Sequence, residues 1–143
     1  MIVADANLLL YAYNPSAAQH EKAKRWLEQT IAGPEMLGLP WVTILAFLRI
    51  GTNPRAFPNP LTIAEAVSIV AEWFEQPGVR VMKFAEAPWT ALSPLLIRAQ
   101  IKGPLVTDAH LAALAIEHGA TLCSSDGDFS RFPALRWSNP LAS

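Results

Sequence analysis

Two stretches of the sequence decide the fold, Val106-Thr107-Asp108-Ala109-His110 and Ser124-Ser125-Asp126-Gly127-Asp128-Phe129, together with Asp5 near the N-terminus. In each stretch an aspartate stands where an apolar run gives way to a helix or a turn. Asp5 stands in the same position after the apolar residues 1–4. The carboxyl ends of parallel strands meet along one edge of an α/β sheet, so acids that are far apart in the sequence can converge there.

Converging carboxylates predict a metal site. They repel one another and raise one another's pKa values, and a divalent cation such as Mg²⁺, which prefers oxygen ligands, relieves that repulsion. Taken singly, Asp108 could simply stabilise the start of a helix, and Asp126 and Asp128 could belong to an ordinary turn around Gly127. Asp5 has no such structural explanation, because the strand before it needs no acid to fold. We therefore base the prediction on the set of acids.

The rest of the sequence predicts one domain over residues 1–143. Strand-like and helix-like segments alternate, which is typical of a three-layer α/β/α domain with a mainly parallel central sheet. We expect strands at residues 1–5, 36–39, 79–82, 121–124 and 135–137, and helices at residues 8–13, 16–31, 41–50, 62–76, 86–100 and 107–118. Asn7, Thr62 and Thr107 are the expected helix N-caps, and Gly119 is the expected glycine after a helix end.

Charge and cysteine content exclude several classes of protein. The net charge of −1 lacks the bulk positive charge of many nucleic-acid-binding proteins, so only a local basic rim could attract a phosphate. Any one surface cation is more simply a solvated side chain, but the candidates for such a rim are Arg49, Arg55, Arg98, Lys102, Arg131 and Arg136. The single cysteine, Cys123, allows no disulfide within the chain, and no Cys/His spacing suggests zinc. We expect neither a signal peptide before Asp5 nor a membrane span, and hence a soluble, cytoplasmic protein.

The chain is more apolar than a typical domain. Hydrophobic residues make up 52% and charged residues 16% of the sequence, against typical values of about 45–50% and about 25%. We expect a homodimer whose contact is made by helices rich in Leu, Trp and Phe. A well-filled core in a monomer is the alternative explanation.

Several motifs resemble those of PIN-domain ribonucleases. Asp5-Ala6-Asn7, Thr107-Asp108-Ala109 and Ser125-Asp126-Gly127-Asp128-Phe129 are similar to the acidic motifs of that family. Within the family, the chain resembles the VapC-type toxins of toxin–antitoxin pairs, and among these a mycobacterial-type branch. The motifs that resemble this branch are Leu39-Pro40-Trp41, Phe47-Leu48-Arg49, Thr52-Asn53-Pro54-Arg55 and the run from Asp108 to Ala115. The similarity extends in order over nearly all 143 residues.

The resemblance implies endonucleolytic cleavage of RNA that depends on Mg²⁺ or Mn²⁺. It implies that Asp5, Asp108 and Asp126 hold the metal, and that Asp128 assists directly or through water. It also implies that Asn7 and Thr107 or Ser125 contact the ligands or their waters, and that a VapB-type antitoxin is the partner. Arg49 is a candidate for contact with a phosphate or for pairing with an acid.

One position departs from the family pattern. Ala46, in Leu45-Ala46-Phe47-Leu48-Arg49, stands where the family usually carries a glutamate. The absence of this glutamate should weaken metal binding or leave more ligand positions to water. A second hypothesis therefore stays open, a PIN-like module that binds RNA or a partner with weak or no catalysis. A phosphatase of another α/β fold ranks third, because that chemistry usually needs a second acid where this chain has Asn7.

Overall fold

Five parallel strands form the central sheet of the computed structural model, which describes residues 1–84 and 87–142. Their order across the sheet is β3-β2-β1-β4-β5, and every neighbouring pair is parallel. The strands are β1 (Ile2–Ala4), β2 (Leu37–Pro40), β3 (Val79–Met82), β4 (Thr121–Cys123) and β5 (Arg136–Ser138). The all-parallel sheet confirms the predicted α/β class, and β1 lies at its centre.

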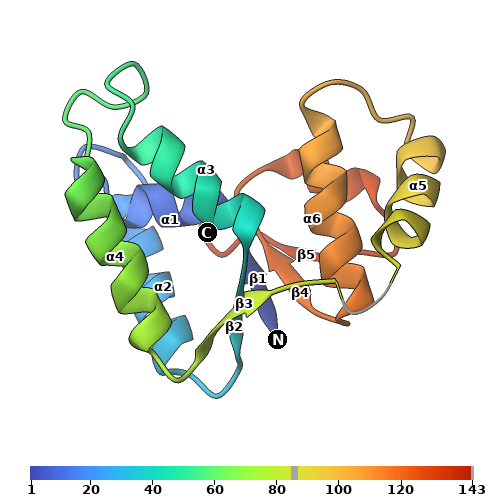
Figure 1. Cartoon of the computed structure of the whole chain (residues 1–143), viewed down its shortest axis with the longest axis horizontal. Coiled ribbons are helices and arrows are strands. Elements are labelled where there is room, and N and C mark those ends of the chain that lie inside the picture. The colour runs from blue at the N-terminus through green and yellow to red at the C-terminus, as the bar shows by residue number, and fades with distance from the viewer. Residues whose placement is uncertain (85–86, 143) are drawn as a thin grey trace.

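Helices cover both faces of this sheet (Figure 1). The helices are α1 (Ala6–Ala12), α2 (His20–Ala32), α3 (Trp41–Gly51), α4 (Ile63–Glu75), α5 (Pro88–Arg98) and α6 (Leu105–Glu117), and a short 3-10 helix, η1 (Gly127–Arg131), follows β4. α1 to α4 gather on one side of the strands and α5 and α6 on the other. This arrangement confirms the predicted three layers.

Two hydrophobic clusters hold the layers together. Successive strand residues point to opposite faces of a sheet, and Ala4 and Cys123 belong to the cluster of α1 to α4, whereas Val3 and Leu122 belong to the cluster of α6 and η1. Each of these strands is therefore buried on both faces, as expected for a parallel sheet between two helical layers. A side chain at Gly38 would collide with Met82, so β2 and β3 pack closely at this point.

Most predicted elements are confirmed, including the capping box of Thr62 and Glu65 and the positive φ of Gly119 after α6. Two predicted caps are wrong. Asp5 rather than Asn7 is the N-cap of α1, and its carboxylate accepts a hydrogen bond from the Ala6 amide. Thr107 does not cap α6, because that helix begins two residues earlier, at Leu105.

One further predicted helix start is wrong, and another lies outside the described residues. α2 begins at His20 instead of Ser16, because the intervening residues form turns. The predicted start at Glu86 lies outside the described residues, and the described helix there, α5, runs through Pro94 without ending. None of the helices in the described part of the chain is long and apolar enough to cross a membrane.

Candidate metal centre

The pairing of β1 with β4 brings the two ends of the chain together. Ala4 and Cys123 are partners in the register, and the Asp5 amide donates a 3.0 Å hydrogen bond to the Cys123 carbonyl. Asp5 and Ser124 therefore leave the sheet side by side, at the carboxyl ends of neighbouring strands. This is the edge of the sheet at which the sequence predicts that the acids converge.

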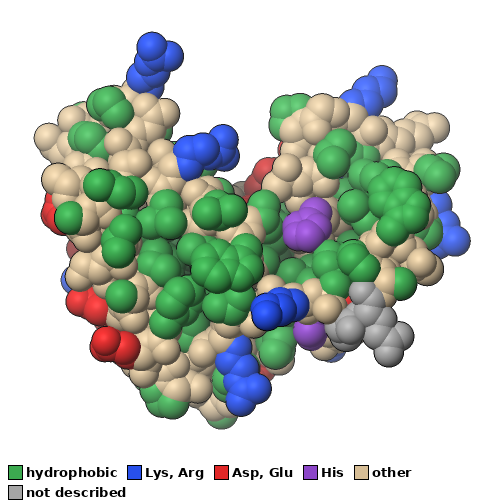
Figure 2. Space-filling model, in the orientation of Figure 1, with side chains coloured by type: hydrophobic (Ala, Val, Ile, Leu, Met, Phe, Trp, Pro, Cys, Tyr) green, Lys and Arg blue, Asp and Glu red, His purple; other side chains and the backbone are tan. Residues whose placement is uncertain are grey.

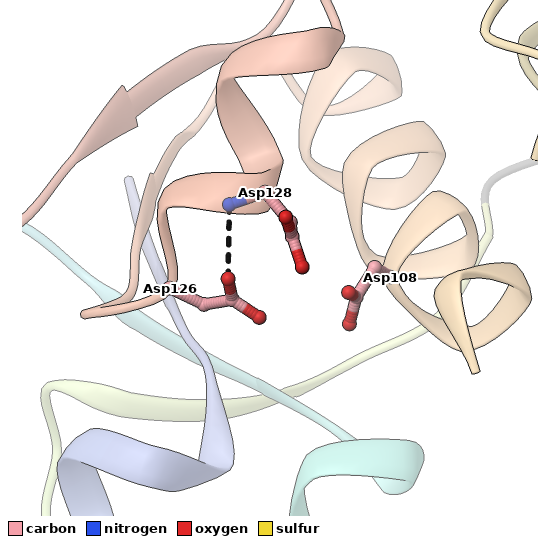
Figure 3. A group of neighbouring side chains, drawn as sticks. All are labelled: Asp108, Asp126 and Asp128. Carbon is pink, nitrogen blue, oxygen red and sulfur yellow. Dashed lines mark hydrogen bonds between the residues drawn. The ribbon is translucent and has the colours of Figure 1, made fainter.

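Three further carboxylates meet beside these strand ends (Figure 3). One oxygen from each of Asp108, Asp126 and Asp128 lies within 4.8 Å of the others. Asp108 comes from the first turn of α6, whereas Asp126 and Asp128 come from the start of η1. Asp126 also shapes η1, because its Oδ1 accepts a 2.9 Å hydrogen bond from the Asp128 amide.

Asp5 is the most enclosed of the acids, and both of its oxygens accept hydrogen bonds. Oδ1 accepts from the Ala6 amide at 2.8 Å, and Oδ2 accepts from the Ser124 hydroxyl at 2.7 Å. Burial, with a smaller contribution from the charge of Asp126, raises the pKa of Asp5 above its ordinary value. Asp5 lies outside the 4.8 Å group of the other three, but its negative charge contributes to the raised pKa of Asp108.

The pKa of Asp108 shows most directly how the neighbouring negative charges interact. Its pKa is raised to about 6, first by burial and then by the charges of Asp5, Asp126 and Asp128. The positive charge of Arg131 opposes the shift. The three other predicted acids therefore act on Asp108, and in the absence of a cation Asp108 holds a proton at weakly acidic pH.

The donor set fits a hard divalent cation. Mg²⁺ binds six oxygens at about 2.1 Å, so opposite ligands lie about 4.2 Å apart. Asp108, Asp126 and Asp128 offer carboxylate oxygens within 4.8 Å of one another, which is close to that upper spacing. The more enclosed Asp5 adds a fourth negative charge beside this group. The described residues thus supply the chemistry that Mg²⁺ or Mn²⁺ requires.

Ser124 links these groups, and the sequence did not single it out. Its side chain is fully buried. Its hydroxyl donates to Asp5 and accepts hydrogen bonds from the Asp126 amide at 3.0 Å and from the Asn7 side chain at 3.1 Å. The available signal was a polar residue directly after the apolar run of β4, where a buried hydroxyl needs partners. The sequence predicts a contact from the neighbouring Ser125, whose backbone amide bonds to Asn7.

Thr43 is a second residue that the sequence did not single out. Its side chain is 2% exposed, and its hydroxyl donates a 2.9 Å hydrogen bond to the Ala4 carbonyl. The bond ties the first turn of α3 to the end of β1, next to Asp5. A buried threonine at the start of an apolar helix was the signal that could have revealed it.

The other predicted contacts divide into two groups. Asn7 lies at the site, where its side-chain oxygen accepts a long 3.5 Å hydrogen bond from the Ser125 amide. Thr107 and Arg49 are exposed, at the first turn of α6 and the last turn of α3. Within residues 1–84 and 87–142, the structure gives neither of them a hydrogen bond to an acid of the site. Ala46 is half-buried on α3 and packs against the core, so that helix adds no carboxylate.

Comparison with known proteins gives a family and close relatives. The PIN domain family model matches residues 2–135. The chain is 39% identical to Ribonuclease VapC37 of Mycobacterium tuberculosis over 142 residues, which is 99% of each protein. It is 35% identical to Ribonuclease VapC43 of the same species over 141 residues, which is 99% of this chain and 96% of the relative.

Solved structures give the same fold. The crystal structure of VapBC2 from Rickettsia felis, bound to a DNA fragment from its promoter, matches with a TM-score of 0.71 and 20% identity, and the match covers 97% of this chain and 98% of the other. VapC20 of Mycobacterium tuberculosis, a toxin that cleaves the sarcin-ricin loop, matches with a TM-score of 0.68 and 21% identity over 91% and 93% of the two chains.

Proposed function

This chain belongs to the PIN-domain family, among its VapC-type members, and from that membership we propose that it is an endoribonuclease toxin of a toxin–antitoxin pair. The observation that carries the proposal is the convergence of Asp5, Asp108, Asp126 and Asp128 at the ends of β1, β4 and the adjoining helices. A bound RNA phosphodiester would lie over these acids, and the RNA is cleaved there by hydrolysis.

The acids hold Mg²⁺ or Mn²⁺ in this proposal. Asp108, Asp126 and Asp128 would be the ligands, with Asp5 directly behind them. When bound, such a cation activates a water molecule and stabilises the negative charge on the phosphoryl and leaving oxygens. The contribution of the chain is to orient the carboxylates, and Ser124 does so by fixing Asp5 and the Asp126 amide through one hydroxyl.

Asp108 has a further part in this chemistry. Because its pKa is about 6 in the metal-free protein, the carboxylate is partly protonated at weakly acidic pH and must lose that proton to bind a cation. Cation binding is therefore coupled to proton release from Asp108. The hydrolytic activity should fall with the loss of this ligand at acidic pH.

A VapB-type antitoxin is the proposed partner. The similarity to VapBC complexes supports it, because these structures pair a chain of the same fold with an antitoxin. Figure 2 shows a hollow between the α3–α4 side and the α5–α6 side of the molecule, where an RNA or a partner segment could approach the acids. An antitoxin segment in this hollow would exclude RNA from the site.

A homodimer is the proposed assembly. α3 and α4 expose an apolar patch, seen on the face in Figure 2, that consists of Trp41, Leu45, Ile63, Val67 and Phe74. The rings of Trp41 and Phe74 pack edge to face at 6.2 Å. Exposed apolar patches of this kind mark contact surfaces in soluble proteins. This patch carries Leu, Trp and Phe side chains, as the predicted dimer contact requires.

Cleavage of a structured RNA by the purified protein tests the function. We expect cleavage with Mg²⁺ or Mn²⁺, none with EDTA, and a loss of at least about 100-fold in Asp108→Asn, since one catalytic group usually contributes 10²–10⁴-fold. Metal-independent cleavage that survives both Asp5→Asn and Asp108→Asn would refute the proposal. Retention of RNA without turnover in excess Mn²⁺ would instead support the binding module suggested by Ala46.

A further inference from the structure

Arg131, one of the six cations that the sequence offers for a basic rim, lies at the acid site. It ends η1, and its Nε donates a 3.2 Å hydrogen bond to the backbone carbonyl of Asp128. Its Nη2 lies 3.5 Å from Asp128 Oδ1. The guanidinium therefore turns back over the helix toward the carboxylates.

The backbone on both sides of Arg131 is anchored in the core. Phe129 is fully buried and Phe132 is 2% exposed, and their rings lie 6.4 Å apart. The Asp126 carboxylate fixes the first turn of η1 through the Asp128 amide. This anchored backbone limits where the Arg131 side chain can extend, and it keeps the positive charge of the guanidinium close to the acids.

The charge of Arg131 acts on the centre of the site. It is the cation that opposes the negative charges around Asp108. The four acids alone would repel an RNA phosphate, so a positive group beside them is needed to hold the substrate anion. Among the contacts of the site acids, Arg131 supplies that charge, whereas Arg49 does not contact them.

The contacts of Arg131 leave its outer donors available. Its Nε bond fixes the orientation of the guanidinium, but the Nη2 contact with Asp128 is longer than the 2.7–2.9 Å of a strong charged hydrogen bond. The side chain is 37% exposed and so faces the solvent from which RNA arrives. A cation bound to Asp128 would draw charge from its carboxylate and weaken this ion pair further.

We propose that Arg131 binds a phosphate oxygen of the RNA at the acid site, through the Nη donors that its contacts with Asp128 leave available. A planar guanidinium can make two parallel hydrogen bonds to a phosphate, which an ammonium group cannot do. The inference rests on the proposed function, since it names the residue that holds the substrate of that same site. The alternative is a purely structural role, in which the contacts of Arg131 with Asp128 only stabilise η1.

Three variants separate these roles: Arg131→Ala, Arg131→Lys and, as a matched control, Arg25→Ala, whose arginine is exposed on α2. We would measure RNA cleavage in Mn²⁺, Mn²⁺ affinity by calorimetry, and thermal unfolding. We expect Arg131→Ala to lower kcat/KM about 10- to 100-fold, the range for one lost hydrogen bond to a charged group. Arg131→Lys should recover part of the loss, and Arg25→Ala should match the wild type.

The metal measurement distinguishes substrate binding from support of Asp128. Mn²⁺ affinity should be unchanged or tighter in Arg131→Ala, because a repelling charge has been removed. Cleavage within about twofold of the wild type, or a loss of cleavage matched by an equal loss of Mn²⁺ affinity, would overturn the inference.

RNA binding keeps the inference testable if the wild type cuts nothing. That result would end the proposed function, but RNA affinity in Mn²⁺ could still be compared across a range of salt concentrations. Loss of one phosphate contact should reduce the slope of log affinity against log salt by about 0.7. An unchanged slope in Arg131→Ala would overturn the inference independently of any activity.

Discussion

The hydroxyl of Ser124 donates a 2.7 Å hydrogen bond to Oδ2 of Asp5, across 119 positions of the sequence. The same hydroxyl accepts bonds from the Asp126 amide and the Asn7 side chain, so one buried group fixes both sides of the acid site. The orientation of Asp5 therefore depends on the pairing of β1 with β4. Folding of the sheet and assembly of the site are the same event.

Replacing Ser124 should destabilise the protein and the site together. Ser124→Ala leaves the Asp5 carboxylate, the Asp126 amide and the Asn7 amide without their common partner, and a buried group left unpaired costs about 1–3 kcal/mol. We expect a loss of that size in urea unfolding. Ser125→Ala is the matched control, because Ser125 contributes its backbone amide to Asn7. An equal free energy of unfolding in the two variants would show that the hydrogen bonds of Ser124 add nothing to stability.

The raised pKa of Asp108 predicts how the metal-free protein responds to pH. The unfolded carboxyl titrates near 3.8 and the folded one near 6, so between these values the folded state binds more protons. Stability from this group therefore falls as pH rises through that window, and Asp5 acts in the same direction. Unfolding in EDTA at about pH 5 and about pH 7.5 should show the difference.

Asp108→Asn makes this prediction sharper. At neutral pH the variant removes a carboxylate that the folded state disfavours, so metal-free stability should rise by about 1 kcal/mol, a value discounted because the group is partly exposed. The dependence on pH between about 4 and about 6 should shrink. A variant that is less stable than the wild type in EDTA would mean that Asp108 has a structural role that we have not identified.

Metal binding should weaken as the site is acidified. Mn²⁺ must displace the proton from Asp108, so affinity should fall by up to about tenfold per pH unit below the pKa of about 6. Calorimetry across that range measures this, and buffers of different ionisation enthalpy would reveal the released proton. Affinity that does not change with pH would indicate that Asp108 is not a ligand.

The apolar patch on α3 and α4 predicts a disruptable homodimer. Leu45 is 58% exposed, and burial of that remaining surface in an interface would stabilise the dimer by about 1–2 kcal/mol. Leu45→Glu should therefore shift a dimer toward the monomer in light scattering, whereas Gln29→Glu, which adds the same charge on exposed α2, should not. A wild type that is monomeric at high concentration would remove the dimer from the proposal.

The sequence predicted what depends on local pattern. Alternation and helical spacing located the strands and helices, and an acid after an apolar run located Asp5, Asp108 and Asp126. It did not locate Ser124, and it offered Arg131 only as one of six candidate cations, because the roles of both residues depend on proximity in space. Ser124 meets Asp5 only through the β1–β4 register, and Arg131 meets the acids only because η1 turns its side chain back. Thr107 failed as a cap because Gly103 and Pro104 end the loop earlier.

Ala46 offers a gain-of-function test of the whole site. The Thr43 hydroxyl donates to the Ala4 carbonyl, and this side of α3 therefore faces the end of β1. Ala46 lies about one turn further along the same helix, about 4.5 Å along its axis. A glutamate there would extend toward the existing acids and restore the carboxylate that the family usually carries.

Ala46→Glu should bind Mn²⁺ several-fold to about tenfold more tightly, because another negative oxygen ligand becomes available. In EDTA the same variant should unfold more easily, because the added carboxylate repels the others when no cation is present. Ser68→Glu, on the exposed side of α4, is the control for added charge. Tighter Mn²⁺ binding that Ser68→Glu does not share would place position 46 beside the acids, whereas unchanged affinity would place it elsewhere.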